Sequence, residues 1–226
     1  MTKQIKTKSV KAVKVLIVDD HPAVREGLAI KLTWEAGLEV CGEADDVAEA
    51  LKLFAATEPD VIVVDISLKN GNGLDLIKRL KLRDDSVRVL VWSMYPDSLY
   101  AERALRAGAL GYINKEQATD KIIEAIRRVL AGKVYLSEPM AEKILMRASR
   151  GSHDAPPGPP VESLSDRELE TFQLIGQGLD THQIAQKMRV SSKTVDTYRA
   201  RIKEKLGLEN FHQLIQTAAN WATEER

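Results

Sequence analysis

Cysteine and long apolar runs are scarce in this sequence. Its 226 residues include one cysteine, Cys41, so no disulfide can form within the chain. No apolar run approaches the about 18 residues that cross a bilayer, and the lysine-rich N-terminus lacks the apolar segment of a secretion signal. We therefore expect a cytoplasmic protein in a reducing setting, with no membrane partner.

Net charge is also lacking, because 33 Lys and Arg residues balance 33 Asp and Glu residues. No overall field attracts nucleic acid or a membrane, so such a partner must be met by a local patch. Hydrophobic residues make up 44% and charged residues 29% of the chain, which is ordinary globular usage and excludes a disordered or collagen-like protein. The length exceeds one typical domain of about 100–200 residues and favours one large domain or two small ones.

The first half of the chain alternates two patterns. Short runs rich in β-branched residues are separated by stretches whose apolar residues recur every three or four positions. Near-continuous apolar strands are covered on both faces, so the pattern predicts a doubly wound parallel sheet of five strands. The predicted strands are 13–19, 38–42, 61–65, 87–93 and 111–114, and the predicted helices are 22–36, 47–56, 73–82, 98–107 and 117–130.

The second half divides into a linker and a small helical domain. Residues 147–160 carry four prolines and two glycines, which predicts an extended linker. Beyond it the periodicity is only helical: Ser165 and Glu168 form a capping-box pattern, and Thr181 is a candidate cap for the next helix. We predict an α/β domain at 13–131, a linker at 132–162 and an all-α domain at 163–226, with helices at 166–176, 183–188, 193–206 and 210–221.

Three aspartates lie at the ends of predicted strands. Asp19 and Asp20 end the first strand, and Asp65 ends the third. Ligands of doubly wound sheets bind at the carboxyl ends of strands where the strand order reverses. If the order is 2-1-3-4-5, the three carboxylates converge, and a hard divalent cation such as Mg²⁺ relieves their repulsion.

A hydroxyl and a lysine complete this edge of the sheet. Ser93 closes the fourth strand and Lys115 follows the fifth. A carboxylate nucleophile that takes a phosphoryl group needs a cation and a lysine to neutralise the phosphoryl oxygens, and a hydroxyl to bond one of them. A single strand-end aspartate is more often a helix cap or a loop group. Five matching positions together favour phosphoryl acceptance.

Residues 13–130 resemble the receiver domain of two-component response regulators, on the strength of these strand-end residues. The resemblance implies a flavodoxin-like fold, a sensor histidine kinase as partner, and Mg²⁺ as cofactor. It implies that Asp65 is the phosphoacceptor, that Ser93 moves toward the phosphoryl group, and that Tyr112 then turns inward. The implied metal site comprises Asp19, Asp20, Asp65 and the backbone carbonyl of Ser67, and the implied switch and phosphate-binding residues are Ser93, Tyr112 and Lys115.

A basic segment lies in the helical domain. Between Lys187 and Leu206 there are seven Lys and Arg residues and two acidic residues. Such a cluster is usually a solvated helix face. Here it falls on the second helix of a helix, turn, helix unit, whose face opposite Val195, Ile202 and Leu206 is small, polar and basic, as in helices that enter the major groove. The candidate DNA-binding residues are Lys193, Thr194, Asp196, Thr197, Arg199, Arg201 and Lys205.

Residues 164–219 resemble the LuxR-type helix-turn-helix of the NarL/FixJ class of response regulators. The matching blocks are Leu164 to Glu168, Ile184-Ala185, Ser192 to Val195 and Lys205 to Gly207. The resemblance implies binding to double-stranded operator DNA and dimerisation through the last helix, where Trp221 and His212 are expected in the core or the dimer interface.

These features predict a transcriptional regulator, not an enzyme. Phosphorylation of Asp65 by a histidine kinase would shift an existing equilibrium toward a DNA-binding homodimer. Two alternatives stay open: a DNA-binding regulator whose receiver answers to something other than phosphate, and an aspartyl-phosphate phosphotransferase. The latter is disfavoured because the helical domain shows no catalytic cluster.

Overall fold

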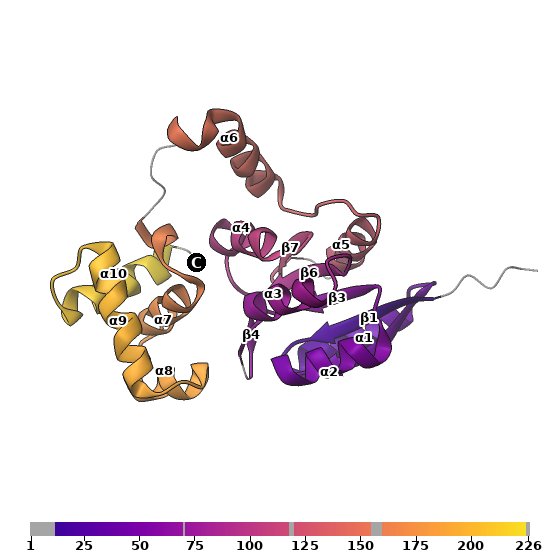
Figure 1. Cartoon of the computed structure of the whole chain (residues 1–226), viewed down its shortest axis with the longest axis horizontal. Coiled ribbons are helices and arrows are strands. Elements are labelled where there is room, and N and C mark those ends of the chain that lie inside the picture. The colour runs from indigo at the N-terminus through magenta and orange to yellow at the C-terminus, as the bar shows by residue number, and fades with distance from the viewer. Residues whose placement is uncertain (1–11, 70, 118–119, 155–159, 225–226) are drawn as a thin grey trace, which may run out of the picture.

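Five parallel strands form the central sheet of the N-terminal half (Figure 1). The computed structural model describes residues 12–69, 71–117, 120–154 and 160–224. The strand order is β2-β1-β3-β6-β7, which confirms the predicted 2-1-3-4-5 arrangement. The strands are β1 (Val13–Val18), β2 (Leu38–Ala44), β3 (Val61–Val64), β6 (Arg88–Ser93) and β7 (Gly111–Asn114).

Helices cover both faces of this sheet, as the apolar strands require. Every residue of β3 is buried. One face packs against α1 (Pro22–Thr33) and α5 (Asp120–Leu130), and the other packs against α2 (Val47–Thr57), α3 (Gly73–Arg83) and α4 (Asp97–Ala107). The doubly wound fold class is therefore confirmed.

A small hairpin after β3 was not predicted. It comprises β4 (Ser67–Leu68) and β5 (Gly71–Asn72), which pair antiparallel beside the end of β3. Gly73 at the start of α3 lies so close to the chain that a Cβ there would stand 2.1 Å from the backbone oxygen of Asp65. Only glycine fits this approach, which holds the start of α3 against Asp65.

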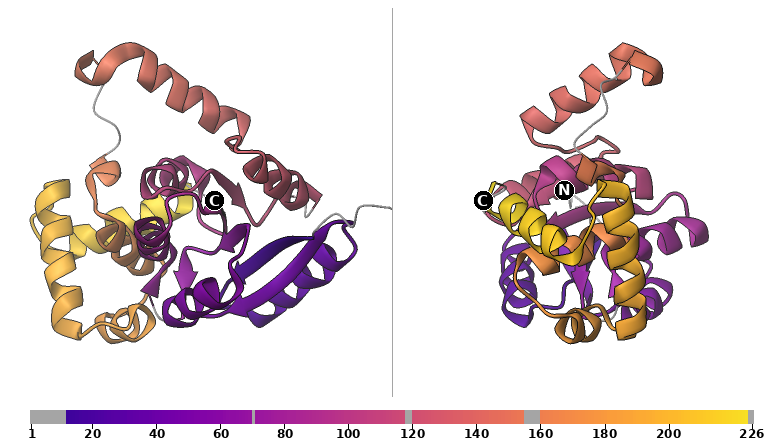
Figure 2. Two further views of the ribbon diagram at one scale, coloured as in Figure 1. Left: turned by 45° about the vertical axis from the view of Figure 1, so that its right-hand side comes forward. Right: turned by 90° about the vertical axis from the view of Figure 1, so that its left-hand side faces the viewer.

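The segment predicted as an extended linker is partly helical, so that prediction was wrong for residues 147–154. Helix α6 (Glu138–Asp154) leaves the sheet and stands along α4 (Figures 1 and 2). Met140 of α6 is buried, and Arg147 forms an ion pair of 2.6 Å with Glu102 of α4. These contacts offset the weak local helix preference. Pro156, Pro157 and Pro159 lie outside the described residues.

The C-terminal domain is helical, as predicted. It contains the 3-10 turn η1 (Pro160–Ser163), α7 (Asp166–Gly176), α8 (Thr181–Met188), α9 (Ser192–Leu206) and α10 (Phe211–Glu224). The capping box of Ser165 and Glu168 is confirmed. Thr181 is not the cap of α8; Asp180 caps it, because an aspartate one residue earlier can accept from the Gln183 amide.

Helix α7 faces the α/β domain, and α9 lies on the far side of α7 (Figure 1). None of the helices in the described ranges has both the length and the hydropathy needed to span a bilayer.

Candidate phosphoryl-acceptor site and DNA-binding helix

The three predicted aspartates meet at the carboxyl edge of the sheet. Asp19 and Asp20 follow β1, and Asp65 follows the neighbouring β3; with His21, they offer ligand atoms that all lie within 4.8 Å of one another. Asp19 and Asp65 are buried. The strand order brings these side chains together, as the sequence predicted.

This donor set fits a hard divalent cation. Asp20 Oδ1 is buried and accepts no hydrogen bond of good geometry from the described residues, although His21 Nδ1 lies 2.8 Å away. A buried carboxylate oxygen without a donor is costly unless a cation faces it. Carboxylate oxygens are the ligands that Mg²⁺ prefers. The backbone of Ser67 lies at the same site, where its N–H donates to Asp65 Oδ1 at 3.4 Å.

Asp65 is held on both of its oxygens. Ser93 at the end of β6 donates its hydroxyl to Oδ1 at 2.6 Å, and Lys115 after β7 donates to Oδ2 at 2.6 Å. Lys115 also bonds Asp19 Oδ2 at 2.5 Å and is 5% exposed. Its ammonium group lies 5.5 Å from the ring centroid of Trp92, within range of a cation–π contact. The hydroxyl and the lysine therefore lie where the predicted chemistry needs them.

Burial dominates the electrostatics of these carboxyls. Desolvation raises the pKa of Asp65 above its usual value, with Lys115 acting against the shift and Asp19 adding to it. Burial also raises the pKa of Asp20, opposed by His21. Both shifts have the sign expected when like charges gather in a low-dielectric site.

Tyr112 is turned inward in this structure, and its movement on phosphorylation stays a prediction. Its ring is 1% exposed, and its hydroxyl donates to the backbone oxygen of Tyr95 at 2.6 Å. The hydroxyl of Ser93 is likewise already bonded to Asp65. The ring stays inside because the Tyr95 carbonyl satisfies its buried hydroxyl.

Tyr95 and Tyr100 connect this site to the helical domain. Their rings stack with centroids 4.8 Å apart, and the hydroxyl of Tyr100 donates to Gln173 Oε1 of α7 at 2.7 Å. Tyr100 is fully buried. This contact was not predicted, because a tyrosine in α4 and a glutamine in α7 carry no local sign of pairing.

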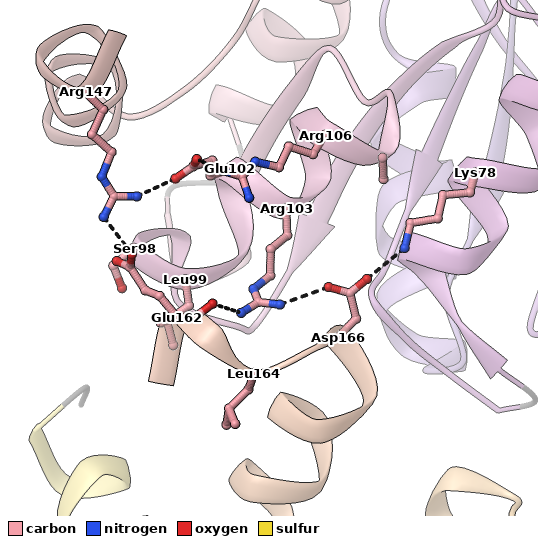
Figure 3. Close-up of a pocket in the computed structure, with 11 residues that line it drawn as sticks. Lys78, Ser98, Leu99, Glu102, Arg103, Arg106, Arg147, Glu162, Leu164 and Asp166 are labelled. Carbon is pink, nitrogen blue, oxygen red and sulfur yellow. Dashed lines mark hydrogen bonds and ion pairs between the residues drawn. The ribbon is translucent and has the colours of Figure 1, made fainter. Parts of the chain in front are cut away.

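Ion pairs surround the same junction. Asp166 at the start of α7 accepts from Lys78 of α3 at 2.9 Å and from Arg103 of α4 at 3.1 Å. Burial would raise the pKa of Asp166, but these two cations outweigh it and lower the pKa. Figure 3 shows Arg147 of α6 reaching Glu102 and Glu162 across a cavity of about 310 Å³. The network joins α3, α4, α6 and α7.

A second set of polar contacts reaches the hairpin after β3. Glu170 of α7 accepts from the side-chain amide of Asn72 at 3.1 Å, and Arg167 reaches Asp75 at 3.2 Å. Glu170 is 6% exposed, and burial raises its pKa. Asn72 also caps α3, two residues before Leu74. The helical domain is thus docked beside the strand-end carboxylates.

The outer face of α9 is left exposed by this docking. Val195 and Ile202 are buried against α7 and α8, as the periodicity predicted. Helix α9 runs along the edge of its domain (Figure 2). Lys193, Asp196, Thr197, Ala200 and Arg201 are exposed.

Three candidate DNA-binding residues are engaged within the protein. Arg199 donates to the Thr181 hydroxyl and stacks on the ring of Phe211, with 3.4 Å between the guanidinium carbon and the centroid. Lys205 bonds Glu168 at 2.6 Å. Thr194 is half-buried and pairs with Ser191, the cap of α9. Arg199 and Thr194 are therefore half-buried, whereas Lys205 is ion-paired but stays exposed.

Trp221 and His212 were expected in the core or in a dimer interface. Tyr198 packs against the core, and Trp221 lies 5.6 Å from the ring of Phe172. His212 is exposed, so it is not a core residue. Its place in a dimer interface stays a prediction.

Two family models match this chain. The response regulator receiver domain matches residues 15–127, and the bacterial regulatory proteins of the luxR family match residues 162–218. The chain is 38% identical to the DNA-binding transcriptional activator DevR/DosR of Mycobacterium tuberculosis, over 94% of each chain. It is 34% identical to the response regulator GacA of Pseudomonas aeruginosa, over 91% of this chain and 95% of GacA.

A solved structure matches nearly the whole chain. RcsB from Salmonella enterica serovar Typhimurium, bound to the rprA promoter in the presence of BeF₃⁻, matches with a TM-score of 0.64 and 25% identity. The match covers 92% of this chain and 99% of RcsB. The present chain belongs to the response regulators that join a receiver domain to a LuxR-type DNA-binding domain.

Proposed function

We propose that Asp65 accepts a phosphoryl group and that this controls operator binding by the C-terminal domain. One observation carries the proposal: Ser93 and Lys115 each bond a different oxygen of Asp65. The hydroxyl and the ammonium group are thereby positioned to bind phosphoryl oxygens once the carboxylate has reacted.

The chemistry is a single displacement at phosphorus. A carboxylate oxygen of Asp65 forms the new O–P bond while the P–N bond of a kinase phosphohistidine breaks, and the imidazole keeps the electron pair and later takes a proton. Asp19, Asp20, Asp65 and the Ser67 carbonyl would hold Mg²⁺, which neutralises phosphoryl oxygens when bound. Lys115 turns from Asp65 toward the phosphoryl group, and Ser93 follows it.

A sensor histidine kinase fits the surface beside this site. An apolar cavity of about 540 Å³ opens next to Lys115, lined by Val24 and Leu28 of α1 and by Ile122 of α5. Met94 also lines this cavity and is 56% exposed. Apolar surface of this kind next to a reactive carboxylate suits a helical partner that must bring its phosphohistidine to Asp65.

We propose that phosphorylation acts on the docking of the two domains. Movement of Ser93 would shift the β6–α4 loop, which contains Tyr95, and so disturb the stack on Tyr100 and its bond to Gln173. Since the outer face of α9 is already exposed, release would act by freeing the domain to form a homodimer on two half-sites, and not by uncovering α9. A swing from 1:99 to 99:1 would require about 5.5 kcal/mol of differential stabilisation.

We further propose a receiver domain at 13–131, a linker at 132–162 and a DNA-binding domain at 163–226. We also propose that the protein is a cytoplasmic regulator and not an enzyme. The relatives named above as a transcriptional activator and a response regulator support this choice over a phosphotransferase.

Acetyl phosphate labelling tests the proposal. Wild type incubated with acetyl phosphate and Mg²⁺ should gain one phosphoryl group on Asp65, mapped by mass spectrometry after borohydride reduction. Asp65→Asn should gain none, and Asp85→Asn, at an exposed aspartate of the same domain, should label like wild type. Labelling of Asp65→Asn to the wild-type level would overturn the assignment.

A further inference from the structure

One carboxylate lies on the exposed stripe of α9. Lys193, Asp196, Thr197 and Ala200 are all exposed and follow the spacing i, i+3, i+4, i+7, so they share one face of the helix. The stripe is about 10 Å long at 1.5 Å per residue. That length matches roughly three base-pair steps of B-DNA, at about 3.4 Å per step.

Asp196 has no evident task inside the protein. It lies beyond the first turn of α9, so it does little to stabilise the helix dipole. Its carboxylate is 64% exposed and lies 3.4 Å from Arg199, whose guanidinium is already bonded to Thr181 and stacked on Phe211. An exposed pair of this kind contributes little stability.

Near DNA the same carboxylate is unfavourable unless it finds a donor. Phosphate oxygens repel it, and it has no proton to give to an acceptor on a base. In the major groove, guanine presents two acceptors, thymine presents an acceptor and a methyl group, and adenine presents a donor beside the N7 acceptor. Cytosine presents its N4 amino group without an acceptor beside it.

We infer that Asp196 is a specificity-determining residue that accepts a hydrogen bond from the N4 amino group of a cytosine in each operator half-site. Lys193, one turn earlier on the stripe, suits a neighbouring guanine, whose O6 and N7 accept from a lysine. Asp196 thereby selects against guanine and thymine, which offer it no donor, and less strongly against adenine, whose N6 donor has the N7 acceptor beside it. The inference rests on the proposed function and deepens it.

Selection from random-sequence DNA tests this role. Full-length wild type, Asp196→Asn, Asp196→Ala and Glu204→Gln are treated with acetyl phosphate and Mg²⁺ and selected at one fixed salt concentration. Glu204 is the matched control, since it is an exposed acid in the last turn of α9, away from the N-terminal part that enters the groove. Circular dichroism establishes that each variant is folded.

Wild type should enrich a paired motif with cytosine at one position of each half-site. Asp196→Ala should lose at least about fivefold of the preference at that position alone, and Asp196→Asn should move it toward adenine, which an amide can bond at N6 and N7. Glu204→Gln should keep the wild-type motif.

Two results would overturn the inference. If both Asp196 variants select the wild-type motif and merely bind all DNA more tightly, Asp196 is a repulsive charge and reads no base. If wild type enriches no motif while remaining fully phosphorylated, operator binding itself fails and the inference falls with it; motif enrichment by wild type therefore distinguishes the two failures.

Discussion

The two working regions of this protein are built in opposite ways. At the phosphoryl-acceptor site, Asp65 is 3% exposed and both of its oxygens are bonded by side chains, Ser93 at the end of β6 and Lys115 just after β7. On α9, Asp196 is 64% exposed and has one weak partner. A reacting carboxylate needs bonding groups that are already in place when charge moves during the reaction. A helix face that contacts DNA bases needs side chains that are not already bonded within the protein.

The difference also predicts where substitutions are costly. Breaking a buried ion pair leaves an uncompensated charge, whereas an exposed pair is screened by water and contributes little. The following substitutions test how far this contrast holds.

Replacing Lys115 should have the largest effect. Lys115→Met leaves Asp19 and Asp65 buried without their shared cation, so the free energy of unfolding should fall by about 3 kcal/mol or more. Urea unfolding measures this change in the free energy of unfolding. The matched control is Lys69→Met, which removes an exposed ion pair of 3.1 Å to Asp45 and should cost less than about 1 kcal/mol. Equal losses of unfolding free energy in the two variants would contradict the expected difference between buried and exposed ion pairs.

Two arginines on α9 should separate stability from DNA binding. Arg199→Ala removes a side chain that bonds Thr181 and stacks on Phe211, so unfolding should become easier by about 2 kcal/mol. Arg201→Ala, at an exposed position, should leave stability within about 0.5 kcal/mol and lower the salt slope of DNA binding by about 1. Thermal unfolding and binding titrations at several salt concentrations measure both. If Arg199→Ala lowered the salt slope and Arg201→Ala lowered stability, Arg199 would be assigned to DNA binding.

The contact between the domains should show a smaller coupling. Tyr100→Phe and Gln173→Leu each remove one partner of a buried hydrogen bond of 2.7 Å. A double-mutant cycle on the free energy of unfolding should give a coupling energy of about 1 kcal/mol. Additive effects would mean that this bond does not hold the domains together.

Acidity should strengthen docking slightly through Glu170. Burial raises the pKa of Glu170 in the docked state, so docking favours its protonated form and is strongest below the pKa of the free side chain. As pH rises through the raised pKa, this contribution is lost. Hydrogen exchange of α7 should therefore slow as pH is lowered from 7 to 5, after correction for intrinsic rates, and Glu170→Gln should remove the trend. A trend that persists unchanged in this variant would assign it to another group.

Sequence patterns were sufficient wherever a local rule decided the structure. The buried run Val61–Val64 predicts a covered strand, and strand order then brings Asp19 to Asp65. Sequence patterns failed where contacts between residues distant in the chain determine the structure. The strands β4 and β5 are too short to show a period, and α6 is anchored on α4 through Lys143 and Arg147, contacts that no local pattern encodes.

Side-chain partners were the hardest part to anticipate. Arg199 looks like a phosphate contact by charge and position, yet it is held by Thr181 and Phe211 from two other helices. The inward position of Tyr112 depends on one carbonyl, that of Tyr95. The bond between Tyr100 and Gln173 depends on how two domains meet, which no local period encodes.

Selection from random-sequence DNA, with the protein phosphorylated and unphosphorylated, tests whether Asp65 controls operator binding. Wild type and Asp65→Ala are each exposed to random-sequence DNA at fixed salt, with and without acetyl phosphate and Mg²⁺. A paired motif enriched only by phosphorylated wild type is the predicted result. Identical enrichment by both proteins in every condition would contradict it and leave a DNA-binding protein whose receiver responds to something other than phosphate.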